Sequence, residues 1–342
     1  MDIYRIIGWY RRIESPRLKL LGILALHVLR RRYLYIALDP SLACNLRCRM
    51  CYFSNSETEQ SRSTFSEEDL RQIARSVFHR GLKLQIGDGA EPTTYKGVAQ
   101  LVKMAHDSGI PHISMSTNGN LMTSELLQQL AANGLTELIV SCHGLDKETY
   151  EGMMRYARFE RFERLIADVG TVRQQYPALR LRINYTICAD NIESLSHFNQ
   201  VFAKVKPDIV QLRPVQDTGS TAYDNYSMEP LVEKYDRCIR PVVSYCQAND
   251  ITCLYPEADN LNAIAKDNAT RHHYNAAINM LPFFHLSPHA TWKEEFNPYE
   301  ETFEQYSKRT HRVRFILKNI IRPQSNHSQD GDVTKALNYH IK

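Results

Sequence analysis

The stretch that decides the fold reads Leu38-Asp-Pro-Ser-Leu-Ala-Cys44-Asn-Leu-Arg-Cys48-Arg-Met-Cys51-Tyr-Phe53. Its three cysteines are spaced by four and three residues, and they follow an apolar, β-rich run, Tyr33-Leu-Tyr-Ile-Ala-Leu38. A strand that ends in such a loop gathers three thiols on one short segment. Thiolates are soft ligands that suit iron–sulfur clusters and zinc. Three of them complete neither a four-cysteine zinc site nor a four-cysteine cluster, so the motif predicts a metal centre with one open coordination position.

The composition is typical of a soluble globular protein. Of the 342 residues, 43% are hydrophobic and 23% are charged, and this length suffices for one large α/β domain or two ordinary ones. The net charge of +4 is too mild to indicate nucleic-acid binding. Beyond the three clustered cysteines, the others are scattered, which is not the pattern of a secreted disulfide framework. We therefore expect a cytoplasmic protein.

The N-terminal residues 1–33 indicate a basic, amphipathic helical extension. Arginines stand on both sides of a mostly apolar run, Leu18 to Leu29. Its apolar part of about ten residues is too short to cross a bilayer, which takes roughly 20, and arginines follow where a signal peptide would have small residues. Two interpretations remain open: a helix that lies over the first strand, which we favour, or a basic helix that rests on anionic lipid.

From residue 33 to about 215 the sequence alternates between strand and helix patterns. Ser66 and the acidic residues after it form a helix start, and Gly81 ends that helix. Strands are expected at 33–38, 82–86, 110–115, 135–140, 179–187 and 208–212, and the intervening helices at 66–80, 95–106, 124–132, 147–154, 159–175 and 192–205. This order favours a parallel sheet with helices outside. Functional residues of such sheets collect at the carboxyl ends of the strands.

Cys-x3-Cys-x2-Cys after the first strand of such a series resembles the signature of the radical S-adenosylmethionine (SAM) superfamily, nearest the branch with molybdopterin-precursor cyclases and peptide-modifying enzymes. The resemblance implies a partial (βα)6 TIM-like barrel, with a [4Fe–4S] cluster on Cys44, Cys48 and Cys51 and SAM on the fourth iron. Reduction of that pair, by an external donor such as flavodoxin or ferredoxin, releases a radical that takes a hydrogen atom from the substrate. The alternatives are three ordinary buried cysteines, or a zinc knuckle with a histidine; the nearest are His27 and His79.

The ends of the later strands resemble the family's SAM-binding stretches. Residues 87–92 resemble Gly-Gly-Glu-Pro, whose backbone holds the SAM amino group, and glycine permits that close approach. Residues 116–119 resemble Thr-Asn-Gly, whose side chains hydrogen-bond the SAM carboxylate or ribose. The cofactor-binding residues that the resemblance implies are Gly89, Ala90, Glu91, Ser116, Thr117, Asn118, Ser141 and Asn184, and Arg213 at the end of the sixth strand is a candidate for the SAM carboxylate. Arg213 also suits an anionic substrate group. Each of these residues has a plain alternative as a turn, hydrogen bond or salt bridge.

His143 stands in Ser141-Cys-His-Gly144, where relatives commonly read Ser-x-Asp-Gly. Strand alternation places Ser141 and His143 on the same face. We hypothesise that His143 is catalytic and contacts substrate as an acid or base near neutral pH; the alternative is a histidine bonded to backbone. Met50 replaces the aromatic residue that commonly precedes the third cysteine, and methionine is adaptable enough to pack on adenine.

The C-terminal third gives weaker signals: a helix at 231–248, a strand at 251–255 and a basic helix at 308–322. Cys238, Cys246 and Cys253 form no Cys-x2-Cys pair, so we interpret them as structural and expect a single cluster. The expected organisation is a helical extension at 1–33, the radical SAM core at 34–222, an α/β-to-helical extension at 223–325 and a disordered tail at 326–342.

The sequence therefore predicts a radical SAM enzyme of unknown reaction subclass. Without auxiliary clusters, a small-molecule, glycan or lipid-linked substrate is favoured. The alternatives are a peptide- or RNA-modifying enzyme and a non-catalytic metal-binding scaffold. The mild charge and the lack of an RNA-binding appendage argue against nucleic acid. The basic segments 19–32 and 308–322 add peripheral membrane contact to the hypothesis.

Overall fold

The computed structural model describes residues 3–51, 54, 63–215, 221, 223, 226–259, 261, 282–288, 290–292 and 296–321. The expected tail at 326–342 lies outside these residues. No helix among them is long and apolar enough to cross a membrane.

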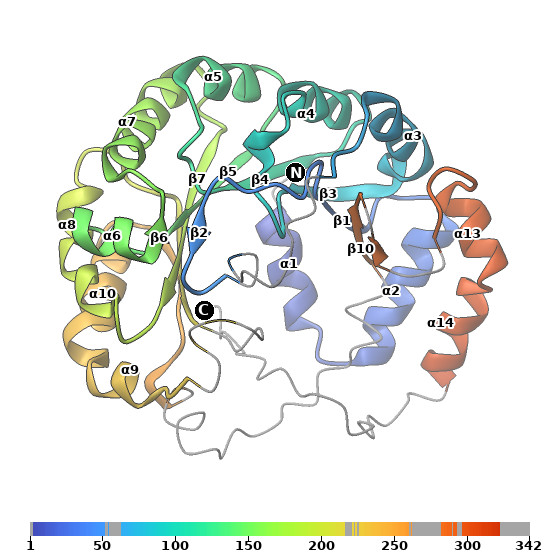
Figure 1. The fold of residues 1–342 in the computed structure, drawn as a ribbon. Helices are drawn as coiled ribbons and strands as arrows, with labels where there is room; N and C mark the ends of the chain where they lie inside the picture. Colours follow the sequence, from blue (N-terminus) through green and yellow to red (C-terminus); the bar gives the residue numbers. More distant parts are fainter. Residues whose placement is uncertain are drawn as a thin grey trace.

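A nine-stranded sheet with the order β11-β10-β1-β3-β4-β5-β7-β8-β9 forms the centre of the molecule (Figure 1). Every pair of neighbours is parallel except β10 and β11. The strands are β1 (Leu34–Leu38), β3 (Gly81–Ile86), β4 (His112–Thr117), β5 (Glu137–Cys142), β7 (Arg180–Ile187), β8 (Ile209–Pro214), β9 (Thr252–Leu254), β10 (Phe283–Ser287) and β11 (Ala290–Trp292). The six expected core strands and the α/β class are confirmed. In the described part of the chain the edge strands β9 and β11 do not pair, so the barrel is partial.

Helices form an arc on the outer side of the curved sheet (Figure 1). The helices labelled there are α3 (Glu67–Val77), α4 (Val98–Asp107), α5 (Ser124–Ala132), α6 (Lys147–Met153), α7 (Phe159–Gln175), α8 (Phe198–Val201), α9 (Glu229–Glu233) and α10 (Arg240–Ala248). Shorter helical segments are η2 (Phe78–Arg80), η3 (Pro92–Thr94), η4 (Ile192–His197) and η5 (Tyr235–Ile239). Ser66 caps α3 in a capping box with Asp69, as expected. The continuous helix expected at 192–205 is wrong. The Ser194 hydroxyl there bonds the backbone N–H of Leu145 and the side chain of Asp146, and residues 192–197 form 3₁₀ turns before the short helix α8.

The sheet turns apolar side chains toward the helices and polar ones inward. On β1, Leu34, Ile36 and Leu38 are fully buried in the core. Tyr35, which alternates with them, bonds Gln85 of β3 at 2.8 Å and lies under the ammonium group of Lys83. This polar interior leads along the strands to their carboxyl ends.

The N-terminal extension consists of two helices, α1 (Ile3–Arg12) and α2 (Pro16–Val28). Tyr4 of α1 contacts the first residues of three strands, since its hydroxyl bonds Glu137 and its ring meets His112 and Arg180. The first helix therefore covers the amino ends of β4, β5 and β7. Helix α2 packs along α14. Its Leu20 and Ile23 are buried in the same core cluster as Leu34 of β1, and its His27 lies 3.0 Å from the hydroxyl of Tyr33, directly before that strand.

The C-terminal part joins the same sheet and the same core. The weak strand signal near 251–255 is confirmed as β9, whereas β10 and β11 were not predicted. The basic helix expected at 308–322 is wrong as one element: it is divided into α13 (Phe303–Arg309) and α14 (Arg312–Ile321). The division falls at His311, whose φ of +49° is left-handed and interrupts the helix.

Candidate functional site

A cavity of about 330 Å³ lies at the carboxyl ends of the sheet's central strands. All thirteen site residues predicted from the sequence line it, namely Cys44, Cys48, Cys51, Gly89, Ala90, Glu91, Ser116, Thr117, Asn118, Ser141, His143, Asn184 and Arg213. Met50 lines it as well. The structure thus brings together residues that the sequence spreads from Cys44 to Arg213. Their individual roles stay predictions.

The cysteine loop is held in place by a small second sheet. Cys48 in β2 (Arg47–Cys48) pairs with Met154 in β6 (Met154–Arg155), which ties the loop to the connection between α6 and α7. Burial raises the pKa of the Cys44 thiol to about 11. Burial and the two other cysteines also raise the pKa of Cys48. Thiols in this setting stay protonated until a cation binds them.

The donor set at the cavity, three cysteine thiols, fits an iron–sulfur cluster. Within the described residues, no three histidine, cysteine or acidic side chains converge closely enough to hold one ion. A zinc ion needs all its ligands about 2.0–2.3 Å from one centre. The thiolates that bind a cluster can stand farther apart, because each binds a different iron atom. Cys44, Cys48 and Cys51 line one cavity and supply the thiolate ligands that such a cluster needs.

Asp39 organises the loop that follows β3. Its carboxylate accepts hydrogen bonds from the backbone N–H groups of Asp88 at 2.8 Å and Gly89 at 3.1 Å. His285 of β10 holds the same carboxylate at 2.9 Å. Sequence reasoning missed both residues. The position of Asp39 directly after the first strand was a usable signal, whereas nothing in the sequence near His285 connects it to this site.

Glu91 ties three loops together. Its carboxylate accepts the hydroxyl of Thr117 at 2.7 Å and the backbone N–H of Asn118 at 2.7 Å. Its own N–H donates to the carbonyl of Ala43, next to the first cysteine, at 3.1 Å. Burial raises the pKa of this carboxyl group. Glu91 therefore positions the cysteine loop relative to the loops after β3 and β4.

Gly87 allows the end of β3 to approach β4 closely. Its φ is +79°, and a Cβ there would lie 2.5 Å from the carbonyl oxygen of Ser116 and 2.8 Å from Pro92. Only glycine fits such a position without displacing backbone.

Some polar side chains at the ends of β4 and β5 bind other parts of the protein, and others are free to bind a ligand. The Thr117 hydroxyl is used by Glu91 and by the backbone of Gly119, and the Asn118 amide donates to Asn45 at 2.9 Å. Among the described residues, the side-chain hydroxyls of Ser116 and Ser141 have no such partner. These two hydroxyls remain available for a ligand in the cavity.

Arg213 supplies an unpaired positive charge at the cavity. It lies at the end of β8, is exposed, and forms no ion pair with any described residue. Asn184 on the neighbouring strand is partly engaged, because its side-chain oxygen accepts the Nε–H of Arg182 at 2.9 Å. Arg213 is therefore the cation that an anionic group in the cavity would meet first.

His143 is held as a neutral imidazole. Its Nδ1 accepts the backbone N–H of Thr186 at 3.3 Å, as in the alternative of a backbone-bonded histidine. Burial and the charge of Arg213 lower its pKa to about 4. At neutral pH the group offers an Nε2–H donor to the cavity, which disfavours the expected role as an acid or base near pH 7.

Comparisons with known proteins agree with this geometry. Residues 38–172 match the model of the radical SAM superfamily. A probable GTP 3′,8-cyclase of Sulfurisphaera tokodaii is 26% identical over 56% of this chain and 59% of its own length. The PqqA peptide cyclase of Bradyrhizobium diazoefficiens is 26% identical over 61% of this chain and 53% of its own. The chain thus spans little more than half of these relatives.

The fold is also that of a solved structure. SuiB of Streptococcus suis bound to S-adenosylmethionine superposes with a TM-score of 0.57 over 75% of this chain and 59% of its own, at 19% identity.

Proposed function

We propose that the protein is a radical SAM enzyme, supported by the match of residues 38–172 to that family's model, and that its Cys44, Cys48 and Cys51 hold a [4Fe–4S] cluster next to a bound SAM molecule. When bound, the two groups supply hydrogen-atom abstraction from an unactivated carbon. The observation that carries the proposal is the convergence of three thiols with the carboxyl-end residues of β3, β4, β5, β7 and β8 on one cavity.

The chain's own residues bind and orient these groups. Asp39 and Glu91 fix the loops after β3 and β4, so that backbone groups of Gly89 and Ala90 are positioned toward the SAM amino group. The free hydroxyls of Ser116 and Ser141 face the cavity as hydrogen-bond donors for the same ligand. Holding these groups in advance lowers the entropic cost of binding and orienting SAM.

We propose a small, polar substrate with an anionic group. The unpaired Arg213 and the Nε2–H of His143 supply a cation and a donor for it. The name of the cyclase relative, which acts on GTP, is consistent with such a substrate. A peptide substrate is the second candidate, favoured by the similarity to a peptide cyclase. Glycan, lipid-linked and RNA substrates have less support.

An acidic electron donor such as flavodoxin or ferredoxin is proposed as a partner. In the small sheet next to Cys48, Arg47 and Arg155 face each other in register, and Arg155 is exposed. Arg155→Glu should slow reduction by flavodoxin while leaving reduction by dithionite unchanged, because a small reductant needs no docking surface. Equal slowing with both reductants would contradict this docking site.

Peripheral membrane contact is also proposed, through helices α2 and α14. Basic and apolar residues share the exposed surface of these two helices.

The test of the proposed chemistry is anaerobic. The protein is reconstituted with iron and sulfide, reduced with dithionite and given SAM, and 5′-deoxyadenosine is measured. Formation should be lost in Cys48→Ala and kept in Cys238→Ala, a buried cysteine away from the cavity. A deuterated cell extract, separated by size, then identifies the substrate class. Deuterium transferred to 5′-deoxyadenosine from the small-molecule fraction supports the first candidate, and transfer from the peptide fraction supports the second.

A further inference from the structure

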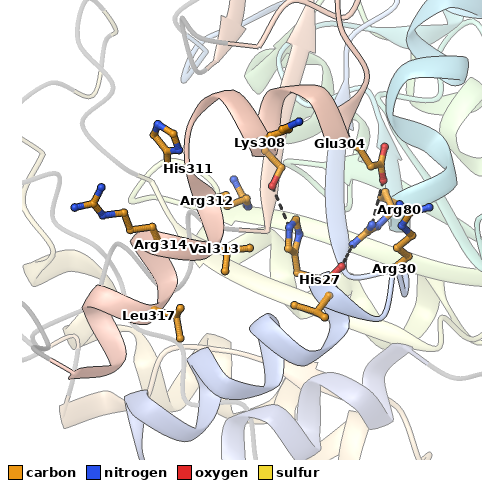
Figure 2. Close-up of a pocket in the computed structure, with 12 residues that line it drawn as sticks. His27, Arg30, Arg80, Glu304, Lys308, His311, Arg312, Val313, Arg314 and Leu317 are labelled. Carbon is orange, nitrogen blue, oxygen red and sulfur yellow. Dashed lines mark hydrogen bonds and ion pairs between the residues drawn. The ribbon is translucent and has the colours of Figure 1, made fainter.

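A second cavity, of about 580 Å³, lies between the end of α2 and the helices α13 and α14 (Figure 2). It is at the opposite end of the strands from the cysteines. Arg80 in its wall directly precedes β3, whereas Cys44 follows the carboxyl end of β1. None of its lining residues belongs to the cavity of the cysteines.

Positive charge dominates this second cavity. Its lining includes Arg30, Arg80, Lys308, Arg312 and Arg314 but a single carboxylate, that of Glu304. Glu304 is already paired with Arg80 at 3.1 Å and with His79 at 2.8 Å. The remaining cations therefore have no carboxylate in the cavity to neutralise them.

Two guanidinium groups of the wall are buried with unused donors. Arg312 is 5% exposed, and its Nε and Nη2 have no hydrogen-bond partner in the described structure. Arg80 is 2% exposed, and its Nε is likewise unpartnered. Aromatic rings lie against both, with the ring centre of Phe303 5.4 Å from each guanidinium carbon. A ring stabilises the charge but accepts no N–H bond in the guanidinium plane, so an anion with several oxygen atoms would complete the site.

The pKa of His27 reflects the positive charge of the same cavity wall. Figure 2 shows its ring between α2 and α13, where Nε2 lies 3.0 Å from the hydroxyl of Ser307. Burial and the charges of Arg80 and Arg312 lower the pKa of His27 to about 4. His27 is thus neutral at physiological pH and adds no charge of its own.

Exposed apolar side chains are concentrated in the N-terminal segment and in α14, and Val28, Val313 and Leu317 among them line this cavity. Eleven of the fourteen large hydrophobic side chains that are exposed in the described residues lie in 3–29 and 312–321: Trp9, Ile13, Leu18, Leu21, Leu26, Val28, Leu29, Val313, Phe315, Leu317 and Ile321. Neither α2 nor α14 contains an acidic residue. We call the exposed side of these two helices, which pack against each other, the α2–α14 face.

We propose that the cavity binds the phosphate of an anionic phospholipid headgroup while the α2–α14 face lies on the membrane. Basic side chains next to exposed apolar ones are the combination that an interfacial helix uses on anionic lipid. A soluble phosphate compound would use the cations and leave the apolar residues exposed. The site rests on the proposed membrane contact but not on the chemistry at the cysteines. Since the two cavities lie at opposite ends of the strands, the bound headgroup is an anchor and not the substrate.

Vesicle flotation of the full chain tests the site. The probes are phosphatidylcholine vesicles with and without phosphatidic acid. Binding should require phosphatidic acid and weaken with salt. The exposed pair of substitutions Arg30→Glu and Arg314→Glu should lower vesicle affinity at least about 20-fold, because each basic residue near an anionic surface contributes about a fivefold factor. Lys204→Glu with Lys206→Glu changes the net charge equally on an exposed segment elsewhere and should change affinity little.

Two further variants separate the contributions. Arg312→Gln removes the buried charge and should weaken binding to the vesicles that contain phosphatidic acid; circular dichroism checks that it is folded. Leu317→Asp should weaken binding, whereas Leu121→Asp, an exposed leucine outside the face, should not.

The outcomes of these experiments distinguish the headgroup site from the alternatives. Vesicle binding that survives Arg30→Glu with Arg314→Glu overturns the headgroup site while the membrane contact stands. Saturable binding of inorganic phosphate without vesicle binding overturns the lipid assignment, and so does binding only to acidic proteins. Formation of 5′-deoxyadenosine should be unchanged in the Arg30 and Arg314 variants, so failure of this site and failure of the proposed chemistry are told apart.

Discussion

The imidazole of His285 lies 2.9 Å from the carboxylate of Asp39, although 246 residues separate them in the sequence. Parallel pairing of β10 with β1 places them side by side, since Ala37 pairs with His285. Asp39 in turn holds the loop of Asp88 and Gly89. A strand from the C-terminal region therefore takes part in shaping the cavity that contains the three cysteines.

Replacing Asp39 tests whether this carboxylate prepares the SAM-binding loop. Asp39→Ala leaves two backbone N–H groups and His285 without their acceptor, a loss of about 1–3 kcal/mol. If the loop binds SAM, affinity for SAM should fall at least about tenfold, measured by equilibrium dialysis on the reconstituted protein. Asp107→Ala on the surface of α4 is the control. Unchanged SAM affinity in Asp39→Ala would remove Asp39 from the binding site.

The same pair predicts a pH dependence of stability. Burial opposes charge on His285, but the hydrogen bond and the charge of Asp39 prevail and raise its pKa above 6.5. A raised pKa stabilises the folded state fully below pH 6.5, and this contribution is lost as pH rises through the folded-state value. The melting temperature of the wild type should therefore exceed that of His285→Gln by the largest margin in mildly acidic buffer. The two melting temperatures should converge when the pH is above the raised pKa of His285. A difference that grows with pH would contradict the ion pair.

Glu91 is predicted to act through structure. In Glu91→Gln an amide N–H₂ replaces one of the oxygen atoms that accept from Thr117 and Asn118, and one buried donor faces another. We expect a loss of about 1–3 kcal/mol in the free energy of unfolding, measured with urea. The exposed Glu163→Gln should cost less than about 0.5 kcal/mol. Equal effects of the two substitutions would show that the hydrogen bonds of Glu91 do not stabilise the fold.

His143 should not titrate near neutral pH. Its pKa is lowered to about 4 by burial and by Arg213, so between pH 6.5 and 4 the unfolded chain takes up a proton before the folded one does. The free energy of unfolding should therefore decrease as the pH is lowered from 6.5 to 4, and His143→Gln should make that decrease smaller. An NMR titration that gives a pKa near 6.5 would refute this and restore the acid–base hypothesis.

The sequence was informative where local pattern and order decide the structure. Cys44, Cys48, Cys51 and the glycine-rich strand ends could be placed because carboxyl ends of parallel strands meet at one edge of a sheet. Helices α5 (Ser124–Ala132) and α7 (Phe159–Gln175) have the expected bounds because amphipathic spacing fixes them locally, and the Thr123 side chain also caps α5.

The pairing of strands far apart in the sequence, and the choice of partner by a polar side chain, were not predictable in this way. Strand β10 is short and lies far from β1 in the sequence, so no local signal announces their pairing or the meeting of His285 with Asp39. The carboxylate of Glu91 accepts hydrogen bonds from Thr117 and Asn118 of a neighbouring loop. The sequence does not show whether such a carboxylate binds the protein itself or a ligand; the geometry does.

The most direct test of the account is electron paramagnetic resonance of the reduced, reconstituted protein before and after SAM is added. With three cysteines holding a [4Fe–4S] cluster and one iron left for SAM, the spectrum should show a reduced cluster, change when SAM binds, and vanish in Cys48→Ala. A cluster whose spectrum is unaffected by saturating SAM, or a protein that binds zinc and no iron, would contradict the central claim.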